Sequence, residues 1–172
     1  MDFFTLLESR RSIRMYASQE IEPDKLEKIL TAANRAPSAG NLQAYEIILV
    51  RSPAVKHQLA QAALDQGFLV QAPVVLAFCA NPDLSAVRYA DRGRTLYCLQ
   101  DATIACAYAQ LAAPALGLAS VWVGAYHDEA VRQALGISTA LIPVALLPVG
   151  YPAEASPARS RRLLSDLVHE LK

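Results

Sequence analysis

Apolar residues recur along the chain with two spacings, one typical of helices and one typical of buried strands. After Pro23, apolar side chains fall at positions i, i+3, i+4 and i+7, as one face of a helix requires: Leu26, Ile29, Leu30 and Ala33. This helix should stop near Ala36, because Pro37 disfavours helical geometry in the residue before it. A shorter amphipathic helix should begin at Phe3 and run into segment 9–12.

Continuous apolar runs predict strands that are buried on both faces. The expected strands are Glu46–Val50, Val74–Cys79, Ser120–Val123 and Val144–Val149. Further helices are expected from Ser52-Pro53, over Thr95 to Ala115, and from a capping Asp128 to Leu135 before Gly136. The tail from Ala153 is polar and basic and ends in an amphipathic stretch, Leu163–Leu171. The pattern predicts a single α+β domain over residues 1–172, with a sheet covered by helices.

Composition narrows the function classes. The 172 residues carry 16 Lys and Arg against 16 Asp and Glu, and 53% of them are hydrophobic. This apolar content excludes intrinsic disorder, and zero net charge argues against a nucleic-acid or membrane-surface partner. Segment 102–127 carries no charged side chain, but Pro114 and Gly117 interrupt it, so a buried helix and strand are expected there rather than a membrane span. The apolar excess leaves room for a buried subunit interface.

Three cysteines, Cys79, Cys98 and Cys106, each lie in an apolar stretch. Their odd number and apolar surroundings favour buried thiols in a reducing compartment, and hence a cytoplasmic protein. At the N-terminus the apolar residues precede the arginines, the reverse of a secretory signal. The three histidines have no Cys or acidic neighbours at metal-ligand spacing, and no nucleophile elbow or phosphate-loop motif occurs. Neither a metal site nor a catalytic triad is expected.

Arginine placement is the first pointer to chemistry. Arg10, Arg11 and Arg14 are interleaved with Ser9 and Ser12 at the end of the first expected helix, and a second group near the other terminus comprises Arg159, Arg161 and Arg162. Guanidinium forks and serine hydroxyls suit phosphate recognition. Two interpretations stay open, surface salt bridges and a shared anionic ligand. The loop 37–43 likewise fits either a ligand loop or an ordinary connection between helix and strand.

The same segments carry a family resemblance. Ser9–Tyr16 (SRRSIRMY) resembles the opening R-R-S-x-R-x-(F/Y) motif of the nitroreductase-like FMN oxidoreductases, and Ala36–Gln43 (APSAGNLQ) resembles their A-P-S-x-x-N-x-Q loop. Segments 96–102 and 117–125 are similar to the family's central helix and following strand, and 148–154 to its closing motif. The resemblance spans essentially the whole chain. The family often continues the loop with Pro-Trp, whereas Ala44-Tyr45 stands here and alters the pocket beside the flavin.

The resemblance implies an intertwined homodimer with a central, mostly antiparallel sheet flanked by helices, and with two FMN sites at the subunit interface. It also implies NADH or NADPH as electron donor and ping-pong transfer to a small planar acceptor such as a nitroaromatic or a quinone. Because the flavin performs the hydride chemistry, no catalytic side chain is expected. Two alternatives are a relative with different flavin chemistry (flavin fragmentation or dehalogenation) and a non-enzymatic module that binds a flavin or another phosphorylated ligand.

Site residues follow from the resemblance position by position. The phosphate and ribityl chain would be held by Arg10, Arg11, Ser12 and Arg14, joined by Arg161 or, as register alternatives, Arg159 or Arg162. The partner subunit's loop would pack on the isoalloxazine through Pro37, Ser38 and Ala39, supported by Asn41 and Gln43. The ring edge would meet Gln66 and the backbone of Gly124 and Ala125.

Overall fold

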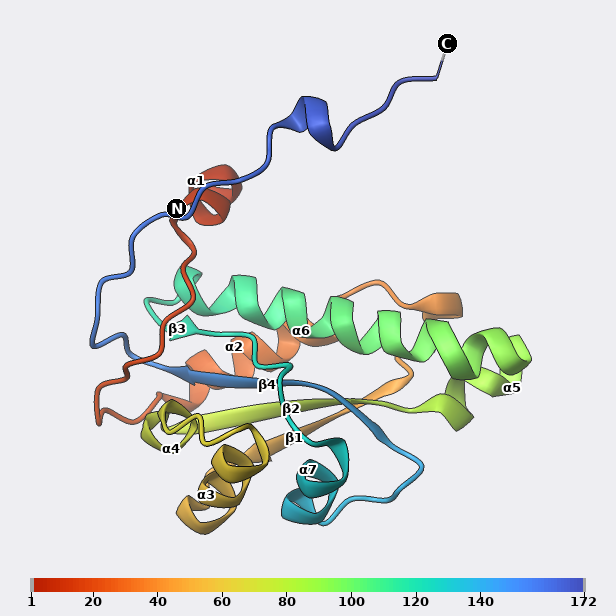
Figure 1. Ribbon diagram of the computed structural model, residues 1–172, viewed down its shortest axis with the longest axis horizontal. Coiled ribbons are helices and arrows are strands. Elements are labelled where there is room, and N and C mark those ends of the chain that lie inside the picture. The colour runs from red at the N-terminus through yellow and green to blue at the C-terminus, as the bar shows by residue number, and fades with distance from the viewer. Residues whose placement is uncertain (1, 172) are drawn as a thin grey trace.

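A four-stranded, fully antiparallel sheet forms the centre of the protein (Figure 1). The structure, a computed structural model, describes residues 2–171. The strand order is β1 (Tyr45–Val50), β2 (Val74–Ala80), β4 (Ile142–Gly150) and β3 (Ala119–Ser120). Every residue of β2 is buried, which confirms the prediction from its unbroken apolar run.

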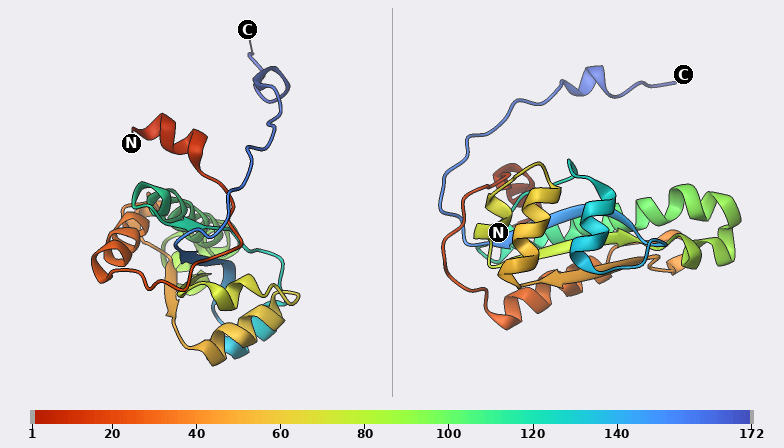
Figure 2. Two further views of the ribbon diagram at one scale, coloured as in Figure 1. Left: turned by 90° about the vertical axis from the view of Figure 1, so that its left-hand side faces the viewer. Right: turned by 60° about the horizontal axis from the view of Figure 1, so that its bottom comes forward.

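Helices cover both faces of this sheet (Figure 2, left). On one face lie α2 (Pro23–Asn34) and α6 (Cys98–Ala115), and on the other α3 (Pro53–Ala62) and α7 (Asp128–Leu135). Because neighbouring strand residues point to opposite faces, Leu147 joins the core beside α2 and α6, whereas Leu146 joins the core beside α3 and α7. The predicted α+β class is confirmed.

Local sequence signals set several helix ends. The Ser52 hydroxyl accepts a hydrogen bond from the backbone N–H of Val55 at the start of α3. Gly136 adopts a left-handed conformation (φ 63°) directly after α7, as predicted. The prediction that Asp128 caps α7 is wrong by one residue, because His127 is the N-cap and Asp128 begins the helix. The long helix also differs from expectation, because a π-helical turn, Gly93–Tyr97, precedes α6.

Other elements depart further from the sequence prediction. The strand expected over Ser120–Val123 shrinks to β3, since only a single bridge pairs Val123 with Leu146. The amphipathic stretch Leu163–Leu171 has exposed side chains, and only a 3-10 turn forms in it, at Leu164–Asp166. The remaining elements are α1 (Phe3–Ser9), a 3-10 turn η1 (Ala39–Asn41), α4 (Phe68–Gln71) and α5 (Pro82–Arg92).

The two ends of the chain project from this body. In Figure 1 and in the left view of Figure 2, α1 and the C-terminal tail lie outside the layers of sheet and helices. Large apolar side chains on these segments are exposed: Phe3, Phe4, Leu7, Leu163, Leu164, Leu167, Val168 and Leu171. All three cysteines are free and buried, as predicted. Within residues 2–171 no helix has the length and apolar character to cross a membrane, and no group of metal-ligating side chains gathers.

Candidate functional site

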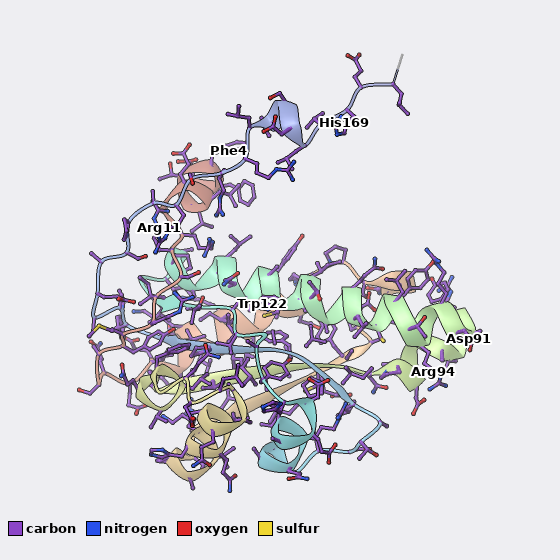
Figure 3. All side chains as sticks on the ribbon, in the orientation of Figure 1. Phe4, Arg11, Asp91, Arg94, Trp122 and His169 are labelled. Carbon is purple, nitrogen blue, oxygen red and sulfur yellow. The ribbon has the colours of Figure 1, made fainter. Side chains whose placement is uncertain are left out.

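The two predicted arginine groups meet in one cleft of about 560 Å³. We call it the arginine cleft, and define it by its lining arginines and serines, which are Arg10, Arg11, Ser12, Arg14, Ser156, Arg159 and Arg161; Glu8 also lines it. Figure 3 shows Arg11 between α1 and the C-terminal tail. Arg162 does not line the cleft, and its Nη2 instead donates to the carbonyl oxygen of Asp166, at 2.8 Å. The structure therefore favours Arg159 and Arg161 over Arg162 as partners of the N-terminal arginines.

Backbone pairing explains why residues so far apart in sequence meet here. Ser12 forms a parallel bridge with Ser120 of β3, and Tyr16 bridges Pro152 just after β4. The Tyr16 side chain is buried, and its hydroxyl donates to the carbonyl oxygen of Ile13 at 2.7 Å. The backbone N–H of Arg14 donates to Oε1 of Glu154 at 2.6 Å. The segment that follows α1 and the segment that follows β4 are thus bonded to each other. Both segments place arginines at the same edge of the sheet.

Two carboxylates, Glu8 and Glu154, lie near the arginine cleft, but within residues 2–171 neither forms an ion pair with its arginines. None of the ion pairs formed within residues 2–171 includes an arginine of the cleft. Burial, followed by the positive charges of Arg161 and Arg11, lowers the pKa of Arg10 below its usual value. Concentrated cations that repel one another favour an anionic ligand, because a phosphate would relieve the repulsion and accept the guanidinium hydrogen bonds. The ion pairs of the described residues thus give no support to the salt-bridge interpretation left open by the sequence.

The 37–43 loop has a strained and internally bonded conformation. Gly40, Asn41 and Gln43 all have positive φ angles, of 58°, 57° and 45°. The Ser38 hydroxyl accepts hydrogen bonds from the backbone N–H of Gln43 at 3.0 Å and from its side-chain amide at 3.1 Å. That amide also donates to Oδ1 of Asn41 at 2.6 Å. Asn41 and Gln43 thus hold the loop's shape, while Ser38 and Ala39 line a second hollow of about 570 Å³ with the start of α6.

Asp101 on α6 anchors this loop, and sequence reasoning did not single it out. Its carboxylate is buried and accepts hydrogen bonds from the backbone N–H groups of Ala39 (2.8 Å) and Ala44 (3.4 Å), one at each end of the loop's turn. An isolated carboxylate directly before the uncharged segment 102–127 was the signal that could have identified it. Ala44 is fully buried, and Tyr45 turns inward to donate its hydroxyl to the carbonyl oxygen of Ala33, at 3.2 Å.

The third predicted group also comes together. The side-chain amide of Gln66 donates to the carbonyl oxygen of Ala125 at 3.2 Å, and to that of Ala63 at 2.8 Å. Gly124 and Ala125 are exposed. His127 lies next to this segment, where its backbone N–H donates to the carbonyl oxygen of Ala62 at 2.9 Å and its exposed side chain flanks α7. The backbone of Gly124 and Ala125 is therefore accessible beside a fixed amide.

Within one chain, the arginine cleft and the 37–43 loop lie at opposite ends of α6. Asp101, which holds the loop, is near the start of the helix, whereas Pro114 near its end lies beside Arg10 and Arg11. At 1.5 Å per residue, Asp101 and Pro114 are about 20 Å apart along the axis. The loop of one chain thus cannot reach a small ligand bound in its own arginine cleft.

Comparison with known proteins places this geometry in a family. The sequence model of the Nitroreductase family matches residues 7–151. The chain is 36% identical over 182 residues to an NADH dehydrogenase of Thermus thermophilus, covering 90% of this chain and 88% of the relative. It is 30% identical over 176 residues to the FMN reductase (NAD(P)H) of Bacillus subtilis, covering 95% and 70%. A solved FMN-dependent nitroreductase from Clostridium difficile superposes with a TM-score of 0.83 at 30% identity over 98% of each chain. On this match, and on the antiparallel sheet and helical layers described above, the chain belongs to the nitroreductase family.

Proposed function

We propose that this chain is an FMN-dependent oxidoreductase that uses NAD(P)H to reduce a small planar acceptor, such as a nitroaromatic or a quinone, by a ping-pong mechanism. Its family and the names of its relatives, which include NAD(P)H nitroreductases and FMN reductases, support the enzyme class, the cofactor and the donor. The observation that carries the proposal is the arginine cleft, because its arginine and serine side chains suit the binding of a phosphate.

The residues present fit FMN at its phosphate end. Arg10, Arg11, Arg14, Arg159 and Arg161 would surround the phosphate, and Ser12 would add a hydroxyl donor. A dianionic phosphate would offset the repulsion that acts on Arg10. A hydrogen bond also orients Arg11, because its guanidinium donates to the carbonyl oxygen of Arg10 at 3.0 Å.

The residues near Gln66 fit the ring end of FMN. The exposed backbone of Gly124 and Ala125 allows close approach of a flat ring, and Gly124 adds no side chain. Because the Gln66 amide nitrogen is bonded to two carbonyl groups, its amide oxygen is directed as an acceptor for the ring's N–H edge. Backbone N–H groups and arginines would stabilise the negative charge of the reduced ring.

A homodimer would complete this site. The 37–43 loop cannot reach its own chain's arginine cleft, so a loop that packs on the ring must come from a second copy. α6 carries partly exposed apolar side chains, including Ile104, Tyr108 and Leu111. The exposed apolar residues of α1 and the tail lie on projecting segments that a partner could cover. We therefore propose an intertwined homodimer, and its buried free thiols suit a cytoplasmic location.

FMN, when bound, supplies the redox chemistry, taking hydride from the nicotinamide and passing electrons on to the acceptor. The chain's own contribution is to bind and orient. The arginine cleft fixes one end of the cofactor, Gln66 and the 124–125 backbone fix the other, and one open face serves donor and acceptor in turn.

A spectrum of the purified protein tests the proposal. The protein should be yellow, and its flavin absorbance should bleach anaerobically on addition of NADH or NADPH. Steady-state kinetics should then give parallel double-reciprocal lines, with the oxidised nicotinamide competing against the acceptor. A colourless protein that gains no colour with FMN would refute flavin binding, and colour without bleaching would favour a binding or flavin-modifying role. His127→Ala should leave flavin reduction within a few-fold of wild type, because His127 flanks α7 and forms no side-chain hydrogen bond within the described residues.

A further inference from the structure

Two arginines lie on two tyrosine rings at the end of the molecule opposite the arginine cleft. We call Arg88, Tyr89, Arg92 and Tyr97 the Arg–Tyr cluster. The guanidinium carbon of Arg88 is 5.6 Å from the ring centroid of Tyr89, and that of Arg92 is 5.4 Å from the ring centroid of Tyr97. The two rings meet edge to face, with centroids 5.1 Å apart. Nε of Arg92 also donates to the Tyr97 hydroxyl at 2.9 Å. Figure 3 marks this end of α5 by Asp91 and Arg94.

The Arg–Tyr cluster is attached to the 37–43 loop. Nη1 of Arg88 lies 3.4 Å from the carbonyl oxygen of Gly40, and Tyr97 lines the same hollow as Ser38 and Ala39. A Cβ atom at Gly40 would come within 2.5 Å of the Tyr89 hydroxyl, so this close approach and the positive φ together require glycine. Wherever the loop packs on a flavin, the Arg–Tyr cluster is therefore carried with it.

The cluster holds positive charge that no carboxylate balances. The ion pair described at this end joins Arg94 to Asp83, and neither Arg88 nor Arg92 forms one within residues 2–171. Stacking on a ring orders a guanidinium without neutralising it, so its remaining N–H groups are available to an anion. Between the two arginines, Ala90 has φ 47° and ψ −133°, a strained conformation of the kind found at binding sites.

From this placement we propose that Arg88 and Arg92 bind a phosphate group of the NAD(P)H donor. The inference rests on the proposed function, because it needs the 37–43 loop beside the flavin ring. A nicotinamide that stacks on the ring leaves the dinucleotide's phosphates to extend beyond the loop, where the Arg–Tyr cluster lies. Arginine pairs suit phosphate oxygens, and ordering by the tyrosine rings lowers the entropy lost on binding.

A comparison of electron donors with and without phosphate groups tests the inference on the FMN-loaded protein. NADH and NADPH carry phosphates, whereas 1-benzyl-1,4-dihydronicotinamide carries the same reducing ring without any. In the double variant Arg88→Gln/Arg92→Gln, the kcat/KM for NAD(P)H relative to that for the benzyl donor should fall about tenfold, since each arginine loses a charge-assisted but solvent-screened contact. Arg92→Lys, which keeps the charge, should recover part of the loss. Arg94→Gln is the matched control, because Arg94 is an exposed arginine on the same segment that pairs with Asp83.

A binding measurement supplies a readout independent of turnover. Calorimetric titration of the FMN-loaded protein with ADP-ribose, or with its 2′-phosphate where only the NADPH reaction is affected, should show about tenfold weaker binding in the double variant than in Arg94→Gln. Equal losses for NADH and NADPH would assign the contact to the pyrophosphate, and a loss confined to NADPH would assign it to the 2′-phosphate. The opposite result would be a double variant with an unchanged ratio of kcat/KM between NAD(P)H and the benzyl donor and with unchanged ADP-ribose binding, while both kinds of donor still reduce its flavin. That result would overturn this inference and leave the proposed function standing. A wild-type protein that neither donor reduces would overturn the proposed function with it.

Discussion

Replacing Arg10 by alanine should weaken FMN binding in a way that depends on the phosphate. Arg10 is half-buried in the arginine cleft, so its contact with a phosphate would be charge-assisted and partly desolvated. Losing such a contact costs about 2–4 kcal/mol, or roughly 30- to 1000-fold in affinity. The substitution also removes the repulsion between Arg10 and its neighbours Arg11 and Arg161, which a bound phosphate would relieve, so this change does not offset the loss of affinity. We therefore expect FMN affinity to decrease by at least about 30-fold.

Titration of FMN and of riboflavin into the apoprotein, followed by flavin fluorescence, measures this effect. Arg10→Ala should weaken FMN binding strongly and riboflavin binding little, because riboflavin has the ring and ribityl chain but no phosphate. Arg162→Ala is the control, since Arg162 is bonded to Asp166 outside the cleft. The apoprotein of Arg10→Ala should be at least as stable as wild type, because a like-charge repulsion is gone. Wild-type affinity for FMN, or equal losses for both flavins, would refute the assignment of Arg10 to the phosphate.

Three further expectations follow from other parts of the structure. Sedimentation at low micromolar concentration should show a dimer, and a stable flavin-loaded monomer would contradict the role of the 37–43 loop in a partner's site. Asp101→Ala should lower the free energy of unfolding by about 2–4 kcal/mol, because two backbone N–H groups lose their acceptor. Asp101→Asn should lower it less, and equal melting temperatures for wild type and Asp101→Ala would contradict this role of Asp101. Burial raises the pKa of Cys79 to about 12, so above pH 9 the unfolded chain binds fewer protons than the folded one and stability should fall as pH rises. A thiol reagent at pH 8 should accordingly label Cys79 only after denaturant is added, and rapid labelling of the native protein would refute its burial.

Periodicity and capping residues were sufficient for much of the fold. The unbroken apolar run of β2 predicted burial on both faces, and Gly136 predicted the end of α7. These signals are local, so they can be read without knowing what packs where. The helix α5 was not predicted, because its mostly polar sequence shows no clear apolar face. Asn81 and Pro82 nevertheless form a helix start signal, and the Asn81 side chain accepts a hydrogen bond from the backbone N–H of Leu84.

The site was only partly predictable, because its geometry depends on contacts between distant segments. Motif resemblance selected the arginines, but only the course of the C-terminal tail in space shows that Arg159 and Arg161 line the cleft, whereas Arg162 is bonded to Asp166. Asp101 was missed for the same reason, since its backbone partners lie more than fifty residues away. At the C-terminal tail, a local pattern has no counterpart in the packing. An amphipathic pattern was present at Leu163–Leu171, but nothing described in this chain packs against it.

The length of α6 between the arginine cleft and the 37–43 loop has a genetic consequence. If each site takes its arginines from one chain and its loop from the other, two defective chains can restore each other. A chain damaged in the cleft, such as Arg10→Ala, and one damaged in the loop anchor, such as Asp101→Ala, would form mixed dimers in which one site carries both lesions and the other carries neither. Co-expression of the two alleles should therefore recover activity that neither allele shows alone, whereas two cleft alleles together should not complement.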